Sequence, residues 1–279
     1  MAYFLSDDLQ MFYIKKGEGV PLVFIHGLGS NHDIWKNQIS ALEKQFTVIA
    51  ADSRYHGSST VNGGAFTAYK VERIAADWIS LLKFVLKREA YLIGLSLGSA
   101  VCMQIAVDYP ELIAGLILVE PWASCDDEHR SRLINWIDMF SNDENASRFN
   151  KTLVQHYFST PFIRDFSEKV KEYETIRNEQ SLQVNLQDCR ACLEFDIRAR
   201  LSEIKAPTML IYGEFDVLIP PYHSKLLMKE IPRAYQIRIK DCGHLPLIER
   251  EEDFNNIIRN FVSAHEIGEN QNRAELKRS

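Results

Sequence analysis

The sequence predicts an α/β fold in which a mostly parallel central sheet carries helices on both faces, with a helical cap inserted between two strands. Two observations predict this fold. Short, continuous apolar runs recur along the chain, which is typical of strands covered on both faces of a sheet. Segments with apolar residues at helical spacing separate these runs, and this alternation favours parallel strands joined by helices.

The expected strands are short apolar runs bounded by turn residues. The first two lie in the stretch LQMFYIKKGEGVPLVFIHG (residues 9–27), where KKGEG supplies a turn between them. Further strands are expected at Phe46–Asp52, Ala90–Gly94, Gly115–Pro121, Thr208–Asp216 and Ala234–His244.

Helical patterns lie between these strands. In the segment Tyr69–Lys87 the apolar residues fall on one face at i, i+3 and i+4 spacing. A second helix is expected at Ser99–Val107 and ends before Pro110, because a proline ring cannot continue a helix. Two more helices are expected at Pro221–Lys229 and Glu251–Ala264.

A long segment without a convincing core strand interrupts the alternation between Trp122 and Glu203. Its sequences, such as HRSRLINWIDMF and NASRFNKTLVQHYF, have helical patterns. We therefore expect residues 122–203 to form a helical cap over the carboxyl-terminal edge of the sheet. Residues 1–121 and 204–265 are expected to form the core, and the polar tail 266–279 is expected to be disordered.

The composition and charge argue against several functional classes. Hydrophobic residues make up 46% of the 279 residues and charged residues 25%, which is ordinary for a globular protein. The net charge of -6, without a basic stripe, argues against nucleic acid as a partner. No apolar run reaches the roughly 18 residues of a membrane span, so no membrane partner is expected.

The cysteines and the N-terminal sequence indicate a cytoplasmic protein. The chain has five cysteines, an odd number, which suits free thiols in a reducing compartment. No basic segment followed by a long apolar block begins the chain, so no secretory signal is expected. Cys189 and Cys192 form a C-x-x-C without a second pair, and we interpret them as small apolar residues of a helix rather than as metal ligands.

The motif G-x-S-x-G at Gly94, Ser96 and Gly98 is the first indication of chemistry. It follows an expected strand and precedes an expected helix, where a sharp turn would expose the serine hydroxyl. A side chain at either glycine would collide with such a turn. The free N–H groups at the start of the following helix would stabilise negative charge on an attacked carbonyl. By itself the motif is also compatible with a tight turn that has no chemical role.

Two further residues turn this motif into a predicted catalytic site. A serine hydroxyl needs a base, and His244 lies directly after the last expected strand, in DCGHLPLIE. The imidazole needs an acid to orient it, and Asp216 follows the preceding strand, in YGEFDVLIPP. The chain order serine, aspartate, histidine is that of α/β-hydrolases.

The chain resembles the α/β-hydrolase fold family over nearly its full length. The resemblance rests on VFIHGLGSNHDIW, DSRYHGSS, LIGLSLGSA, PTMLIYGEFDVLIPP and CGHLPLIEREEDFNNIIRNFV, which occur in the family's order. It implies that the backbone N–H groups of Leu28 and Leu97 form an oxyanion hole. Tyr55 stands where the family usually has a glycine, and it is expected to reshape one wall of the pocket.

Some residues have more than one interpretation. Glu120 ends a strand at a position where some relatives carry the catalytic acid, and it is either that acid or a pocket residue. Trp35 and Trp122 either face the substrate cleft or pack in the core. His26 and the polar residues of DSRYHGSS are interpreted as structural hydrogen-bonding groups. The remaining histidines show no metal-ligand spacing, so no metal site is expected.

The expected activity is hydrolysis of a small ester or lactone through an acyl-enzyme, without a cofactor. The segment ACLEFDIRARLSEIKAPTMLIYGEFDVLIPP resembles 3-oxoadipate enol-lactonases and small carboxylesterases, and LVEPWAS resembles aminoacrylate hydrolases. C–C or C–N bond hydrolases and cofactor-free haloperoxidases use the same three residues, so these activities stay open. A ligand receptor of the same fold is the non-enzymatic alternative, and the oligomeric state is left open.

Overall fold

A nine-stranded sheet forms the centre of the structure. This computed structural model describes the backbone of residues 2–63, 66–141 and 143–276, and their side chains outside 143–148 and 268–276. The strand order is β1-β2-β4-β3-β6-β7-β8-β9, and β5 pairs with β2. The strands are β1 Ala2–Leu5, β2 Leu9–Lys16, β3 Pro21–Ile25, β4 Thr47–Ala51, β5 Thr60–Val61, β6 Ala90–Leu95, β7 Ile113–Val119, β8 Thr208–Gly213 and β9 Ala234–Ile239.

The sheet is parallel from β4 to β9 and antiparallel at its N-terminal edge. Strands β3, β4, β6, β7, β8 and β9 pair in parallel, whereas β1, β4 and β5 each pair antiparallel with β2. In β3, β6, β7 and β8 every residue is buried, as expected for strands covered on both faces. The predicted α/β class is confirmed. The sequence turn between β2 and β3 does not make a hairpin, because β4 lies between these two strands.

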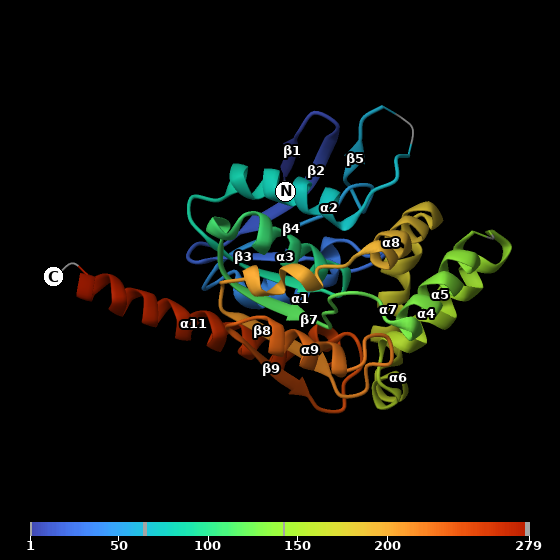
Figure 1. The fold of residues 1–279 in the computed structure, drawn as a ribbon. Helices are drawn as coiled ribbons and strands as arrows, with labels where there is room; N and C mark the ends of the chain where they lie inside the picture. The colour runs from blue at the N-terminus through green and yellow to red at the C-terminus, as the bar shows by residue number, and fades with distance from the viewer. Residues whose placement is uncertain (1, 64–65, 142, 277–279) are drawn as a thin grey trace.

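Crossover direction assigns the core helices to the two faces of the sheet. The chain moves from β3 to β4 in one direction and from β4 through β6 to β9 in the other, so right-handed crossovers put α1 on one face and α2, α3 and α9 on the opposite one. Helix α11 packs against α1, and α2 packs against α3 (Figure 1). The core helices are α1 Lys36–Leu42, α2 Val71–Val85, α3 Leu97–Asp108, α9 Tyr222–Glu230, α10 Pro246–Glu249 and α11 Glu251–Leu276, with 3-10 turns at His32–Trp35 and Pro110–Leu112.

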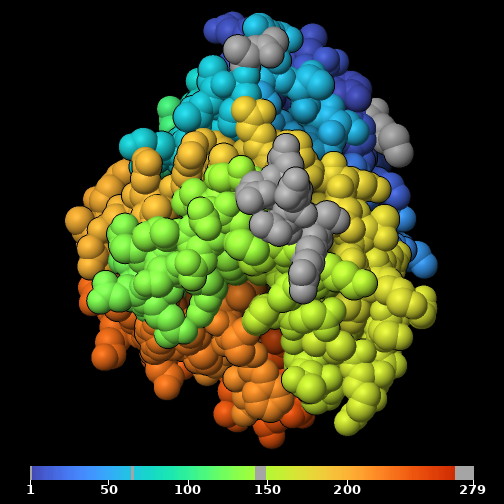
Figure 2. Space-filling view, turned by 90° about the vertical axis from the view of Figure 1, so that its right-hand side faces the viewer, coloured from blue at the N-terminus to red at the C-terminus, as the bar shows by residue number. Residues whose placement is uncertain are grey.

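A helical insertion separates β7 from β8. It contains α4 Asp127–Phe140, α5 Asp143–Tyr157, α6 Thr160–Asp165, α7 Ser167–Asn178 and α8 Leu182–Glu194, followed by a 3-10 helix at Arg198–Glu203. The helices α4–α8 gather beside one edge of the sheet, on the right in Figure 1, and Figure 2 shows that the green and yellow segments cover much of that side. An isolated bridge between Ser124 and Asp196 joins the two ends of the insertion. Within the described residues, no helix combines the length and the apolar character that crossing a membrane requires.

The structure differs from the sequence-based expectation in the N-terminal part of the core and at the C-terminal end of the described chain. Strand β1 and helix α1 were not expected, because neither has a long periodic pattern. Helix α11 continues to Leu276, so the tail from residue 266 is helical to that point rather than disordered. Its sequence contains no proline and is rich in helix-forming residues, which the polarity of the segment obscured.

Gly98 has a packing role that can be tested by substitution. A Cβ atom at this position would lie 2.2 Å from the carbonyl oxygen of Ile25, which is backbone and cannot move aside cheaply. We expect Gly98→Ala to lower the free energy of unfolding by at least about 2 kcal/mol in a urea titration. Gly63→Ala is the control, because nothing lies within 4 Å of that Cβ and only the positive φ of 102° carries a cost. Equal losses for the two variants would contradict this account.

Candidate active site

The site lies at the point where the order of successive strands across the sheet reverses. The connection leaving β3 runs to β4, whereas the connection leaving the neighbouring β6 runs the opposite way to β7. Open α/β sheets leave a crevice outside the carboxyl ends of two such strands. The loop after β3 contains Leu28, and the turn after β6 contains Ser96, so both predicted elements reach this crevice.

Ser96 occupies a strained turn between β6 and α3. Its backbone has φ 53° and ψ −115°, which is a costly conformation for a residue other than glycine. Its N–H donates to the carbonyl of Val119 at 2.8 Å, and the hydroxyl of Ser99 donates to the carbonyls of Gly94 and Val119 at 2.6 and 2.9 Å. These bonds hold the turn against the end of β7. The Ser96 side chain therefore projects from a rigid position.

His244 and Asp216 form a buried pair beside this turn. The distance between His244 Nδ1 and Asp216 Oδ2 is 2.7 Å, and both side chains are almost fully buried. The other carboxylate oxygen, Oδ1, accepts from the N–H groups of Leu218 and Ile219 at 2.7 and 3.2 Å. Burial alone would raise the pKa of Asp216, but His244 and these hydrogen bonds hold that pKa below its ordinary value. Asp216 is therefore an anion that can orient the imidazole.

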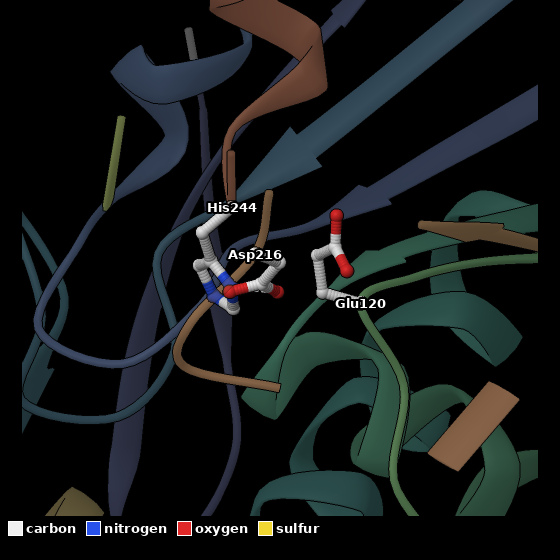
Figure 3. Close-up of side chains that lie close together, drawn as sticks. All are labelled: Glu120, Asp216 and His244. Atoms are coloured by element: carbon white, nitrogen blue, oxygen red, sulfur yellow. Dashed lines mark hydrogen bonds and ion pairs between the residues drawn. The ribbon is translucent and has the colours of Figure 1, made fainter. Parts of the chain in front are cut away.

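Glu120 lies on the other side of Asp216 and is a neutral acid. Figure 3 shows Asp216 between the imidazole of His244 and the carboxyl group of Glu120. Glu120 Oε1 accepts from the N–H of Gly213 at 2.6 Å, whereas Oε2 is buried with no ordinary donor nearby. Burial and the charge of Asp216 raise the pKa of Glu120 well above its usual range. A side-chain hydrogen bond with Asp216 also raises the pKa of Glu120 and lowers that of Asp216, so a shared proton accounts for two buried carboxyl groups lying side by side.

The two candidate acids therefore have different places in the site. The imidazole Nδ1 is paired with Asp216, and Glu120 contacts Asp216 from behind. Glu120 does not line the cavity beside Ser96, because its carboxyl group is enclosed between β7 and β8.

The same three side chains are also the one candidate metal-binding group found in the described part of the chain. The ligand atoms of Glu120, Asp216 and His244 lie within 4.8 Å of one another. A cation there would have to displace both the proton between Nδ1 and Oδ2 and the proton on Glu120. A hydrogen-bonded acid–imidazole pair accounts for the arrangement without that displacement.

A narrow cavity of about 20 Å³ brings Ser96 and His244 together. Such a volume accommodates little more than a single water. The lining residues come from the loop after β3, from the core and from the insertion: Leu28, Ser96, Trp122, His129, Arg132, Leu133, Trp136, Tyr157, Cys192, Leu218, Ile219 and His244. The lining side chains, as they are placed, therefore leave little room for an organic molecule.

The two tryptophans considered from the sequence have different environments. Trp122 lines the cavity, and its buried indole N–H has no hydrogen-bond partner in the described structure. Trp35 lies away from the cavity, between Phe24 and Phe254, with ring centroids 5.1 and 6.3 Å away. It is fully buried in the core because the 3-10 turn that carries it packs against β3.

Four cavity residues of α4 were missed in the sequence. They are His129, Arg132, Leu133 and Trp136, whose i, i+3, i+4 and i+7 spacing places them on one helix face. Because this face mixes polar and apolar residues, the pattern did not stand out. Burial is the main cause that lowers the pKa of His129 to about 3, so its imidazole is neutral. Cys189 and Cys192 are free, buried thiols of α8, and burial raises the pKa of each.

The two residues whose backbone N–H groups are expected to form an oxyanion hole lie on the elements that meet at Ser96. Leu97 is the first residue of α3, so its N–H has no acceptor within the helix. Leu28 lines the cavity from the loop after β3. The predicted oxyanion-hole residues are thus brought to one place by the loop after β3 and the start of α3.

Comparison with known proteins places this geometry in a family. A family model described as the alpha/beta hydrolase fold matches residues 20–251. The chain belongs to the α/β-hydrolase fold family. The match includes β3, the turn at Ser96, the insertion, and the loops of Asp216 and His244, so the family relation covers the whole candidate site.

Proteins similar to this chain include a deacetylase, an enol-lactonase and a lactone-degrading enzyme. The chain is 28% identical to pyrrolizixenacetamide deacetylase of Xenorhabdus hominickii, over 93% of this chain and 97% of that protein. It is 24% identical to 3-oxoadipate enol-lactonase 2 of Acinetobacter baylyi, over 91% and 93%. A solved structure described as Est816, an N-acyl homoserine lactone degrading enzyme, matches with a TM-score of 0.80 and 26% identity, over 93% of this chain and 99% of that one.

The protonation of Glu120 predicts how stability varies with pH. Above the ordinary glutamate pKa of about 4.3, the unfolded chain loses the Glu120 proton, whereas the folded protein keeps it because its pKa is raised. The free energy of unfolding of the wild type therefore falls as the pH rises, until the pH passes the folded-state pKa. Glu120→Gln keeps an acceptor for Gly213 and a donor for Asp216, and it has no such loss. We expect the free energy of unfolding of Glu120→Gln, relative to that of the wild type, to increase by about 1.4 kcal/mol per pH unit between the unfolded-state and folded-state pKa values of Glu120.

Urea titrations at pH 5 and pH 7 measure this difference. Glu111→Gln, at an exposed position, controls for the substitution itself. A difference between Glu120→Gln and the wild type that stays constant with pH would contradict a protonated Glu120.

Proposed function

We propose that the protein is a serine hydrolase that cleaves a small ester or lactone through an acyl-enzyme. Ser96 Oγ attacks the carbonyl carbon while His244 Nε2 takes its proton. The resulting oxyanion accepts from the N–H groups of Leu28 and Leu97. The imidazolium then protonates the leaving oxygen, and water, deprotonated by His244, releases the acid and regenerates Ser96.

The observation that carries the proposal is the meeting of a strained serine turn and a buried acid–imidazole pair in one cavity. Ser96 and His244 line that cavity, and Asp216 Oδ2 lies 2.7 Å from His244 Nδ1. Asp216 leaves Nε2 as the imidazole nitrogen available to accept the serine proton, and it stabilises the imidazolium that forms. The start of α3 supplies N–H groups and a positive dipole end beside Ser96.

The cavity favours a small, mainly apolar acyl or alkyl group. Leu28, Leu133 and Ile219 provide apolar surface, and the free indole N–H of Trp122 provides one donor to a substrate oxygen. The enol-lactonase and the lactone-degrading enzyme among the relatives support an ester or lactone as substrate. The deacetylase makes an acetamide the next bond to test.

We expect substitution of the proposed nucleophile and substitution of the proposed acid to lower kcat with different effects on the labelling of Ser96. We expect Ser96→Ala to lower kcat for p-nitrophenyl acetate by about 10⁴–10⁶-fold, because no acyl-enzyme forms. We expect Asp216→Asn to lower kcat by about 10⁴-fold while a fluorophosphonate still labels Ser96 slowly, because the serine is intact and the imidazole is no longer held in the reactive tautomer.

Steady-state kinetics and mass spectrometry of the labelled protein measure these effects, with Glu111→Gln as a control. Hydrolysis by Ser96→Ala at the wild-type rate would overturn the mechanism. A panel of aryl esters, lactones, enol-lactones and acetamides tests the substrate class. Rapid labelling of Ser96 without turnover of any compound in the panel would favour a ligand receptor instead.

A further inference from the structure

One peptide unit beside the cavity is held at both ends by buried charged side chains of the insertion. The carbonyl of Leu28 and the N–H of Gly29 belong to this unit and point in opposite directions. Arg177 of α7 donates from Nη1 to the Leu28 carbonyl at 2.5 Å. Asp188 of α8 accepts from the Gly29 N–H at 2.8 Å. The peptide plane between residues 28 and 29 is therefore set by two helices outside the core.

Asp188 is rigidly held as an anion. Its Oδ2 also lies 2.9 Å from Nε2 of His56, and its Oδ1 accepts from the hydroxyl of Tyr69 at 2.7 Å. Burial alone would raise the pKa of Asp188, but His56 and these hydrogen bonds lower it. Burial alone would lower the pKa of His56, but the charge of Asp188 raises it. The two side chains thus hold each other in charged form inside the protein.

Arg177 is equally confined. Its side chain is fully buried, its Nη2 donates to Asn185 Oδ1 at 3.1 Å, and its guanidinium lies over the ring of Tyr157 with 5.4 Å to the centroid. Gly29 has φ +57°, and a Cβ there would lie 2.0 Å from Asn185 Oδ1 and 2.5 Å from Arg177 Nη1. The guanidinium of Arg177 therefore occupies space that is open only because residue 29 has no side chain.

The preceding peptide unit is held from the core side. His26 Nε2 accepts from the N–H of Ser53 at 3.0 Å, so its proton lies on Nδ1, which donates to the carbonyl of Gly27 at 2.9 Å. Burial is the first cause that lowers the pKa of His26 to about 4, which keeps this tautomer neutral. Gly27 O and Leu28 N–H share one trans peptide, so fixing the carbonyl fixes the direction of the N–H.

We propose that Arg177 and Asp188 are positioning residues for the oxyanion hole, so that the insertion completes the hole by holding the Leu28–Gly29 peptide. With both peptide planes around Leu28 fixed, its φ and ψ have no freedom, and its N–H cannot turn away from the developing oxyanion. The inference rests on the proposed function, in which that N–H is an oxyanion donor. A misplaced donor weakens the transition state far more than the bound substrate.

Arg177→Met and Asp188→Asn test this proposal. Arg177→Met removes the donor to the Leu28 carbonyl. Asp188→Asn replaces one carboxylate oxygen with an NH₂ group, which cannot accept a hydrogen bond, so the three donors that contact Asp188 are left with one acceptor oxygen. We expect kcat for p-nitrophenyl acetate to fall by about 10–100-fold in each, with KM changed by less than about 3-fold. The inhibition constant of a trifluoromethyl ketone, which forms a tetrahedral oxyanion on Ser96, should rise by the same factor as kcat/KM falls.

Three controls separate positioning from a general loss of structure. Arg177→Lys keeps the charge and one donor and should recover part of kcat. Asp77→Asn breaks another buried pair, with Arg54, and should cost stability without changing the ketone's inhibition constant. The shape of the pH profile of kcat/KM should stay as in the wild type, because His244 and Asp216 are untouched. Circular dichroism establishes that each variant is folded.

The outcomes distinguish this inference from the proposed function. If folded Arg177→Met and Asp188→Asn keep kcat and the inhibition constant within about 2-fold of the wild type, the two residues only attach the insertion to the core and the inference is wrong. If one of the two variants does not fold, the other decides alone, and an unchanged kcat and inhibition constant in it would overturn the inference. If wild-type protein neither hydrolyses the ester nor binds the ketone through Ser96, the proposed function itself fails.

Discussion

The close contact between the start of α3 and the end of β3 is the constraint on which the rest of the site depends. Gly98 lies against the carbonyl of Ile25 with no room for a side chain, and this contact brings the helix start beside the loop after β3. The turn at Ser96 is therefore sharp, and its strain is balanced by hydrogen bonds to β7. One contact of backbone with backbone thus places a serine, a helix N-terminus and the loop of Leu28 at the same crevice.

The insertion contributes to the site in two ways. It lines the cavity with side chains of α4, α5 and α8, and it contacts the loops that carry the reactive groups. The carbonyl of Tyr157 accepts from the N–H of His244 at 2.9 Å, and its ring packs edge-on against the imidazole. The same ring lies under the guanidinium of Arg177, which holds Leu28. The cavity and the support of the loops that carry Leu28 and His244 are therefore parts of one packed unit.

Much of the fold could be predicted from the sequence, because its signals are local. The apolar runs that became β4, β6, β7, β8 and β9 were recognisable by themselves, and so was the sharp turn between Gly94 and Gly98. The inserted helices were also recognisable, although the register of α4 against the cavity was not. The placement of Trp35 and the charged contacts to Leu28 and Gly29 could not be predicted, because the partners lie up to 159 positions apart in the chain.

The sequence by itself determined the order of strands and helices, the strained serine turn, and the loops on which an acid and a histidine follow their strands. These features depend on side-chain periodicity and backbone sterics within a few residues. Only the tertiary structure decided that Asp216 lies beside His244 while burial beside Asp216 raises the pKa of Glu120, and that Arg177 and Asp188 hold one peptide of the loop after β3. Both outcomes depend on desolvation and on distances between groups remote in sequence, which exist only once the core and the insertion have packed together.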